Sequence, residues 1–197
     1  MSRDSSATQA RLLEAAYEEF VGHGLAGARV DRIAKNASAN KQAIYAYFGS
    51  KDDLFDAVLA ARIRVLADVT PFTAHDLAAY AGALFDAFIA DPDLLRLTQW
   101  KSLEQAGASP AERDTHLSKA QDVADVHEVD LDHGMDALMI ALAAAQCWFL
   151  TPAVIRNPTG RNEEARRAQH REAVVAAVEA MTARITGRPA VQPVTGG

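Results

Sequence analysis

The sequence has little cysteine, proline or glycine, and each scarcity excludes a class of protein. Its 197 residues include 1 Cys, 7 Pro and 11 Gly. One Cys cannot form a disulfide framework, and the Gly and Pro contents are far below those of collagen-like or low-complexity chains. Hydrophobic residues make up 49% of the chain, which is enough to form a core and excludes wholesale disorder. We therefore expect a soluble globular protein of one or two domains.

Motifs of enzyme chemistry are also missing. The chain has no Gly-rich phosphate loop, no activated-nucleophile motif and no Glu–His metalloprotease motif. Cys147 has no CxxC partner and lies in an apolar run, where it is interpreted as a small core residue. We expect neither catalysis nor a cofactor.

One acidic segment could ligate a divalent cation. It contains Asp122, Asp125, His127, Glu128, Asp130, Asp132, His133 and Asp136. However, His127 and His133 do not have the i, i+4 spacing that places two ligands on one helical face. A solvated acidic loop is favoured, and we expect no metal.

Signals for export or membrane insertion are weak. Residues 1–6 contain no hydrophobic signal-peptide core, so we expect a reducing cytoplasm. The apolar run from Ala137 to Ile155 approaches the length of a spanning helix. Gln146, Thr151 and Pro152 interrupt it and much of the rest is Ala, which contributes little to insertion. A helix buried within the protein is favoured.

The abundant residue is Ala, the strongest helix former, and apolar residues recur at helical spacing, so we predict an all-α fold. A capping box at Ser6–Gln9 predicts the start of the first helix, whose acidic outer face includes Glu19, and Gly24 predicts its end. The later helices are expected over 29–37, 41–48, 51–69, 75–90, 92–105, 110–128, 132–155 and 161–186. The helix over 132–155 is expected to bend or end near Pro152. The remaining tail, 187–197, is expected to be disordered.

Two short helices joined by a tight turn are the most informative feature. Ser38 and Ala39 are placed in the turn and Asn40 at the N-cap of the second helix, because Ser and Asn suit caps and turns. This is the layout of a DNA-binding helix-turn-helix, whose second helix enters the major groove. The exposed side chains expected there can contact phosphates and base edges. They are Lys41, Gln42 and Tyr45, with Tyr47 and Lys51 just beyond. The alternative is a helical hairpin in which the aromatic residues are core.

The first third of the chain resembles the N-terminal domain of the TetR family of bacterial one-component transcriptional regulators. The matching positions are Leu12-Leu13-Glu14-Ala15-Ala16, Phe20, Gly24, Val30, Ile33-Ala34, Ala37, Lys41, Ile44-Tyr45, Tyr47-Phe48 and Ser50-Lys51-Asp52-Asp53-Leu54. The resemblance covers the first third of the chain. It implies an all-helical C-terminal domain that binds a ligand and dimerises, and a homodimer on double-stranded DNA.

Carried over position by position, the resemblance implies contacts to DNA for Lys41, Gln42, Tyr45 and Tyr47, a helix cap for Asn40, and a phosphate contact for Lys51. The chain departs from the family pattern at Ser38, where Gly is usual, at Arg29, where a hydroxy residue is usual, and at Gln42-Ala43. Arg29 could add a phosphate contact. The recognised sequence therefore cannot be transferred from relatives.

The charge distribution qualifies the expectation of DNA binding. The net charge is −6, which by itself disfavours a nucleic-acid binder. Residues 1–64 contain 9 Lys+Arg and 8 Asp+Glu, so the acidity belongs to the rest of the chain. We call residues 1–64 the head. Because the head is nearly neutral, it would bind DNA through a few specific residues and would bind random DNA weakly.

The two apolar C-terminal helices are expected to form a four-helix dimer interface, because an isologous dimer buries the same face twice. Small side chains allow close approach of the helices. The expected interface residues are Ala141, Ala144, Ala145, Trp148, Val174, Val178 and Met181.

A pocket for a small, lipophilic ligand is expected between the central helices, since such pockets are mostly apolar with few polar groups. Its candidate lining is Phe72, Tyr80, Phe88, Gln99, Trp100, Leu103, Met135, Met139, Gln146 and Phe149. Residues of these types are more often plain core than pocket wall, and that alternative stays open for each of them.

We therefore expect a helix-turn-helix domain over 1–50 and a ligand-binding and dimerisation domain over 51–186, with 51–69 as the linking helix. The expected function is a repressor released from a palindromic operator by a ligand. The alternative is a helical ligand-binding or dimerisation protein whose first domain no longer binds DNA.

Overall fold

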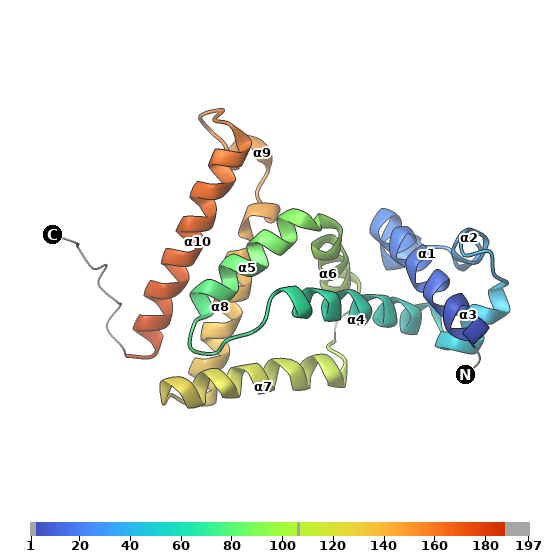
Figure 1. Ribbon diagram of the computed structural model, residues 1–197, viewed down its shortest axis with the longest axis horizontal. Coiled ribbons are helices and arrows are strands. Elements are labelled where there is room, and N and C mark those ends of the chain that lie inside the picture. The colour runs from blue at the N-terminus through green and yellow to red at the C-terminus, as the bar shows by residue number, and fades with distance from the viewer. Residues whose placement is uncertain (1–2, 106, 188–197) are drawn as a thin grey trace. The chain divides into compact units, whose positions relative to one another are not determined.

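The computed structural model describes residues 3–105 and 107–187, in which all regular secondary structure is helical and no strand occurs. Figure 1 shows the arrangement. The helices are α1 (Arg3–Gly27), α2 (Val30–Asn36), α3 (Lys41–Phe48), α4 (Lys51–Val69), α5 (Leu77–Ala90), α6 (Pro92–Glu104), α7 (Pro110–His127), α8 (Leu131–Leu150), α9 (Ala153–Arg156) and α10 (Glu163–Ile185). The predicted all-α fold is confirmed. The predicted tail lies outside the described residues beyond Gly187.

The helix ends show where local sequence signals were enough to predict the bounds of a helix. Helix α4 has the predicted bounds, and Asp91, Ser109 and Asn162 cap α6, α7 and α10 with their side chains. The predicted capping box at Ser6 is wrong, because α1 already begins at Arg3. Helix α8 ends at Leu150, in agreement with the expected bend or end near Pro152, because proline cannot continue the hydrogen-bond ladder.

Gly24 ends the regular part of α1, as predicted. Its φ of +66° is a left-handed conformation that L side chains rarely adopt. A Cβ at this position would also lie 2.7 Å from a carboxylate oxygen of Glu104 and 3.0 Å from Trp100. The turn after Gly24 is held by Glu104, which accepts a hydrogen bond of 2.6 Å from the backbone N–H of Ala26.

The helices form two compact units. The first comprises residues up to Asp68 together with 91–107, and the second comprises 69–90 together with the residues from 108 onward. This division differs from the boundary at residue 50 expected from the sequence. Helices α4 and α6 join the N-terminal unit because their apolar faces complete its core.

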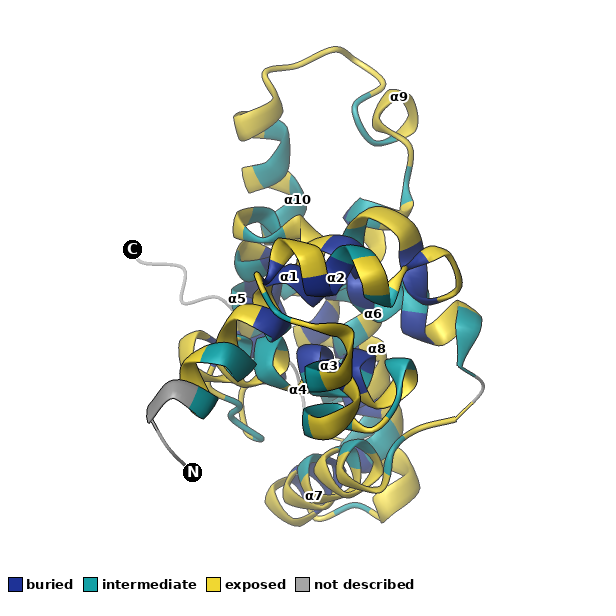
Figure 2. Cartoon of the chain, turned by 90° about the vertical axis from the view of Figure 1, so that its right-hand side faces the viewer, coloured by how far each residue is buried: buried dark blue, intermediate teal, exposed yellow. Residues whose placement is uncertain are grey.

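The core of the first unit is formed by side chains from α1, α2, α3, α4 and α6. Leu12, Phe20, Ile33, Ile44 and Leu97 are fully buried. The dark blue segments in Figure 2 show that α2 and α3 each bury one face and leave the other exposed. At about 25 cal/mol per Å² of apolar surface, this burial is what holds two such short helices in place.

The second unit is a bundle in which α5 packs on α8 and α10, and α7 packs on α8 (Figure 1). Gly134 permits the close approach of α7 and α8, since a Cβ there would lie 2.4 Å from the carbonyl oxygen of Ala120. Phe85 of α5 meets Trp148 of α8 edge to face, with ring centroids 6.3 Å apart.

Helix α8 is the one helix among the described residues whose length and hydropathy would allow it to cross a membrane. In this structure its residues instead pack against α5, α7 and α10, and Gly134, Leu138 and Trp148 lie in the protein interior. The core helix of a globular protein passes the same test of length and composition.

Candidate nucleic-acid interface

The turn between α2 and α3 is tight and slightly strained. The backbone N–H of Ala39 donates back to the carbonyl of Ala34 at 2.9 Å, and that of Ser38 donates to the carbonyl of Lys35 at 3.1 Å. Ser38 adopts a φ of +51°, a conformation that glycine takes without cost. The predicted turn is confirmed. Ser38 occupies it in a backbone conformation that is strained for a residue with a side chain.

Asn40 begins α3 in the predicted manner. Its backbone is extended, and its side-chain oxygen accepts a 2.8 Å hydrogen bond from the backbone N–H of Ala43. This bond satisfies one of the free N–H groups at the helix start. The N-cap assignment is confirmed, and it sets the point at which α3 turns away from α2.

Helix α3 presents a polar face to solvent. Ile44 is fully buried and anchors the inner face, whereas Lys41, Gln42 and Tyr45 are exposed, Tyr45 by 46%. The helical period of 3.6 residues places these three side chains together on the outer face. A cation, an amide and a phenol on one exposed face are suited to contact phosphates and base edges.

The ammonium of Lys41 is not free of a partner. Its Nζ lies 3.0 Å from Oδ1 of Asp31 on α2, and both side chains are largely exposed. This hydrogen bond raises the pKa of Lys41 above its ordinary value, so the lysine stays charged, but the neighbouring carboxylate offsets that charge. Spacing in the sequence did not reveal this pair, because it joins two different helices.

The other residues predicted to face DNA have diverse surroundings. Tyr47 is half-buried, and its hydroxyl donates to the hydroxyl oxygen of Ser5 at 3.1 Å. Lys51 donates from Nζ to the backbone carbonyl of Leu25 at 2.7 Å and so closes the end of α1. Arg29 precedes α2 with an exposed side chain. Contacts of these residues with DNA stay predictions, and Arg29 is the most accessible of the three.

A buried carboxylate joins α1 to α2. Glu19 is 5% exposed, although its position was predicted to face solvent, and it accepts hydrogen bonds from the guanidinium of Arg32 and from the backbone N–H of Arg29. Burial alone would raise the pKa of Glu19, but these hydrogen bonds outweigh it and hold the pKa below its ordinary value. This pair fixes α2 on α1. No local sequence signal reveals it, because its partner lies on another helix.

The residues predicted to line a ligand pocket do not form one cluster within either unit. Gln99, Trp100 and Leu103 belong to the first unit, where Trp100 packs against Gly24 and Leu103 is 78% exposed. The second unit contains the other candidates: Phe72, Tyr80, Phe88, Met135, Met139, Gln146 and Phe149.

Aromatic pairs group some of those second-unit candidates. Phe72 meets Tyr80 edge to face with ring centroids 5.2 Å apart, and Phe88 meets Phe149 at 6.1 Å. Met139 is 49% exposed. A shared pocket for these residues stays a prediction.

The helices predicted to dimerise expose different residues from those expected. Five of the expected interface residues lie in the interior of their own protomer: Ala141, Ala145, Trp148, Val174 and Val178. Only Ala144 and Met181 of that set are partly accessible. The cause is α5, which packs on both α8 and α10 and takes their most apolar faces. The exposed apolar residues of α8 include instead Met139, Ile140, Ala143 and Leu150.

The acidic segment that could have bound a cation has structural roles. Asp130 caps α8 by accepting from the backbone N–H of His133 at 2.9 Å, and it also pairs with the imidazole of His133 at 2.7 Å. His127 is buried and bonds to the carbonyl of Ala74. Within the described ranges, no group of three or more His, Cys, Asp or Glu is placed to hold a metal ion.

The chain matches known families along most of its length. Residues 12–58 match the family described as bacterial regulatory proteins, tetR family. Residues 76–180 match the family described as tetracyclin repressor-like, C-terminal domain. The first match contains the α2–turn–α3 segment and the second covers most of the second unit.

Individual relatives agree with these families. The HTH-type transcriptional repressor SCO4008 of Streptomyces coelicolor is 40% identical over 163 residues, covering 79% of this chain and 85% of the relative. A solved structure of a proposed transcriptional regulator, SCO4942 of Streptomyces coelicolor, is 38% identical, with a TM-score of 0.73 over 88% of this chain and 97% of that one. SCO7222 of the same organism, at 21% identity and a TM-score of 0.60 over 95% and 98%, shares the fold.

Regulators of this kind act by binding DNA and are not enzymes, in agreement with the exposed polar face of α3 and with the lack of catalytic motifs. The length and identity of the matches exceed what a shared fold alone would produce. The protein belongs to the TetR family of transcriptional regulators.

Proposed function

We propose that the protein is a cytoplasmic, homodimeric repressor that binds a palindromic operator through α3 and leaves it when a small, lipophilic ligand binds the second unit. The observation that carries the proposal is the face of α3, where Lys41, Gln42 and Tyr45 are exposed on a helix anchored by Ile44 and capped by Asn40. A recognition helix needs this combination of a fixed backbone and free polar side chains.

A homodimer supplies the second recognition helix. Two heads bind a palindrome when their recognition helices reach successive major grooves, about 34 Å apart. Helix α8 leaves Met139, Ile140 and Leu150 exposed by 49%, 45% and 63%, which is unfavourable for the surface of a monomer. We propose that α8 and α10 pair with the same helices of a second copy through this outer face.

Release by a ligand requires different affinities of the ligand for the DNA-binding and the released conformations. The aromatic pairs Phe72–Tyr80 and Phe88–Phe149 lie in the second unit, and we propose that such a ligand would bind among these apolar side chains. A lipophilic ligand there would change the separation of the two heads. A compound that releases the protein from its operator would support this step, and failure of a broad panel of apolar compounds would count against it.

The test of DNA binding uses the full-length protein and DNA from upstream of its own coding sequence. We expect a salt-sensitive shift in mobility or fluorescence anisotropy, because phosphate contacts release counterions. Lys41→Ala and Tyr45→Ala should each weaken binding at least tenfold with unchanged circular dichroism. Arg113→Ala is the matched control, since Arg113 is exposed on α7 of the second unit. Unchanged affinity in both α3 variants would reject the assignment of the recognition helix.

The alternative is a dimeric ligand-binding protein whose head no longer binds DNA. The observations that favour it are the pairing of Lys41 with Asp31 and the use of Lys51 inside the head, because both reduce the charge available to phosphate. Selection of bound fragments from a random DNA library separates the two functions. An enriched palindrome supports the repressor, and no enrichment supports the alternative.

A further inference from the structure

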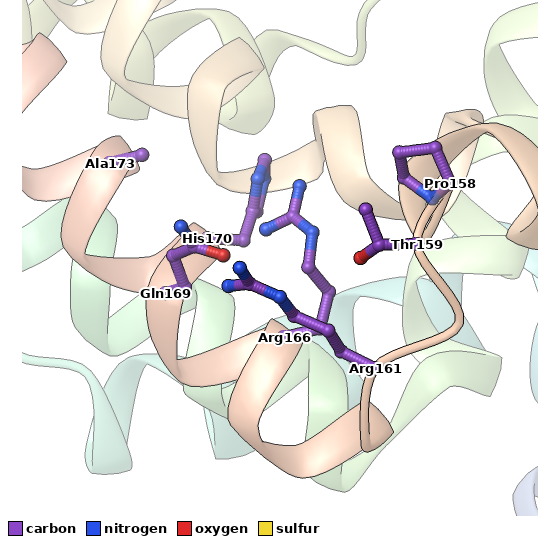
Figure 3. Close-up of a pocket in the computed structure, with 7 residues that line it drawn as sticks. All are labelled: Pro158, Thr159, Arg161, Arg166, Gln169, His170 and Ala173. Carbon is purple, nitrogen blue, oxygen red and sulfur yellow. The ribbon is translucent and has the colours of Figure 1, made fainter.

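A cavity of about 350 Å³ lies between the loop that precedes α10 and the first turns of α10. This volume is at the lower end of the range for small-molecule sites. Figure 3 shows the side chains around it: Pro158, Thr159, Arg161, Arg166, Gln169, His170 and Ala173. None of these is acidic, and none belongs to the apolar set predicted for a lipophilic ligand.

The arginines near this cavity differ in whether they have an acidic partner. Arg167 pairs with Glu163 at 2.6 Å, Arg171 pairs with Asp86 at 2.7 Å, and Arg156 lies 3.7 Å from Glu163. Arg161 and Arg166 form no ion pair with any residue in the described part of the chain. These two unpaired guanidinium groups are the two that line the cavity, and Figure 3 shows both extending into it.

Arg166 is held in position by neutral contacts. Its Nε donates to the backbone carbonyl of Arg156 at 2.8 Å, and its guanidinium lies 5.3 Å from the ring centroid of Trp148, over the ring. This hydrogen bond uses one of the five N–H groups, and the other four have no hydrogen-bond partner in the described part of the chain. A guanidinium oriented beforehand loses less entropy when it binds a planar carboxylate or a phosphate.

The loop that carries Arg161 is also ordered by its own hydrogen bonds. The side chain of Asn157 donates to the carbonyl of Arg161 at 2.8 Å and accepts from its backbone N–H at 3.0 Å. Gly160, with a φ of +63°, permits the sharp turn between them. The backbone of Arg161 is thereby held at the rim of the cavity.

Neutral polar groups complete the lining. Thr159 and Gln169 offer a hydroxyl and an amide, and His170 adds an imidazole whose Nε2 lies 3.4 Å from Sγ of Cys147. Burial, followed by the nearby charge of Arg166, lowers the pKa of His170 below its ordinary value, so the imidazole is neutral at pH 7. The positive charge of the cavity therefore comes from its two arginines.

We propose that this cavity binds a small organic or inorganic anion, a carboxylate or a phosphate, between the guanidinium groups of Arg161 and Arg166. Unpaired cations around a concave surface without an acidic side chain favour an anion, and guanidinium groups match the geometry of both oxyanions. The cavity shares no residue with α3 or with the apolar set of the proposed function, so its test does not depend on DNA binding.

The experiment titrates the full-length protein by calorimetry in Tris chloride at constant ionic strength, with inorganic phosphate in one arm and benzoate in the other. We expect saturable binding of at least one probe. Binding of phosphate alone identifies a phosphoryl ligand, binding of benzoate alone identifies a carboxylate, and either result supports the site.

Two variants distinguish a specific anion site from non-specific attraction of anions to the protein surface. Arg161→Gln should weaken binding of the effective probe about tenfold or more, since charge-assisted hydrogen bonds are lost. The Arg161 side chain has no partner among the described residues, so this variant should keep its circular dichroism spectrum. Arg113→Gln, on exposed α7, should bind as the parent does. The proposal is overturned if neither probe saturates, or if Arg113→Gln weakens binding as much as Arg161→Gln.

Discussion

Lys41, the first residue of the recognition helix α3, lies 3.0 Å from the carboxylate of Asp31 on α2. The protein therefore places a negative charge beside the cation best positioned to contact phosphate. In complex with DNA, the phosphates and Asp31 would compete for the same ammonium group. The pair offers a physical basis for weak binding to random DNA, in addition to the small net charge of the head.

Asp31→Asn should raise affinity for both specific and random DNA about two- to fivefold, as expected for loss of one exposed opposing charge. The slope of log affinity against log salt should become steeper by about one contact, because Lys41 is then free to bind phosphate. Fluorescence anisotropy at several salt concentrations measures both quantities. Asp114→Asn on α7 is the control, and an equal response in that variant would contradict the role of the Lys41–Asp31 pair.

Glu19→Gln should lower the free energy of unfolding at pH 7 by about 1–3 kcal/mol, because a buried, charge-assisted hydrogen bond to Arg32 is lost. The folded-state pKa of Glu19 lies below its unfolded value, so its contribution is complete above about pH 4.3 and is lost as the pH falls through the folded pKa. Urea unfolding of both proteins from pH 7 to pH 3 measures this dependence. A difference in stability that stays constant over the range would contradict it.

Ser38→Gly should stabilise the head by up to about 1 kcal/mol. The left-handed conformation of Ser38 costs about 1–2 kcal/mol, and glycine removes this cost but adds entropy to the unfolded chain. Thermal unfolding followed by circular dichroism measures the change. Ser38→Ala keeps the strain and should not stabilise, so a gain in both variants would show that backbone conformation is not the cause.

Gly134→Ala should destabilise the second unit by about 1–3 kcal/mol, because the new Cβ would lie 2.4 Å from the backbone carbonyl of Ala120 and would force α7 and α8 apart. Gly22→Ala is the matched control on α1. It has open space around the new Cβ and should stabilise the protein by about 0.5–1 kcal/mol through helix propensity. Chemical denaturation measures both changes, and opposite signs are expected.

The sequence alone determined the helices and most of their ends, because these depend on contacts between neighbouring residues. The cap at Asn40, the turn at Ser38, the end of the regular helix at Gly24 and the bounds of α4 all follow from propensities and side chains within a few positions. The outward face of α3 follows in the same way, from the helical period around Ile44.

Only the tertiary structure decided which helix faces are buried and which charges are paired, because both depend on residues far apart in the chain. Glu19 has the pattern of a surface residue, yet it is buried by Arg32 on the next helix. Trp148 and Val178 are suited to a dimer interface, yet α5 covers α8 and α10, so they became core. Among the described residues, Arg161 and Arg166 have no ion-pair partner, and the nearby acids Glu163 and Asp86 bind other arginines. The local sequence pattern determines where each helix lies in the chain. Contacts among all the helices determine which side chains are buried and which charged groups are paired.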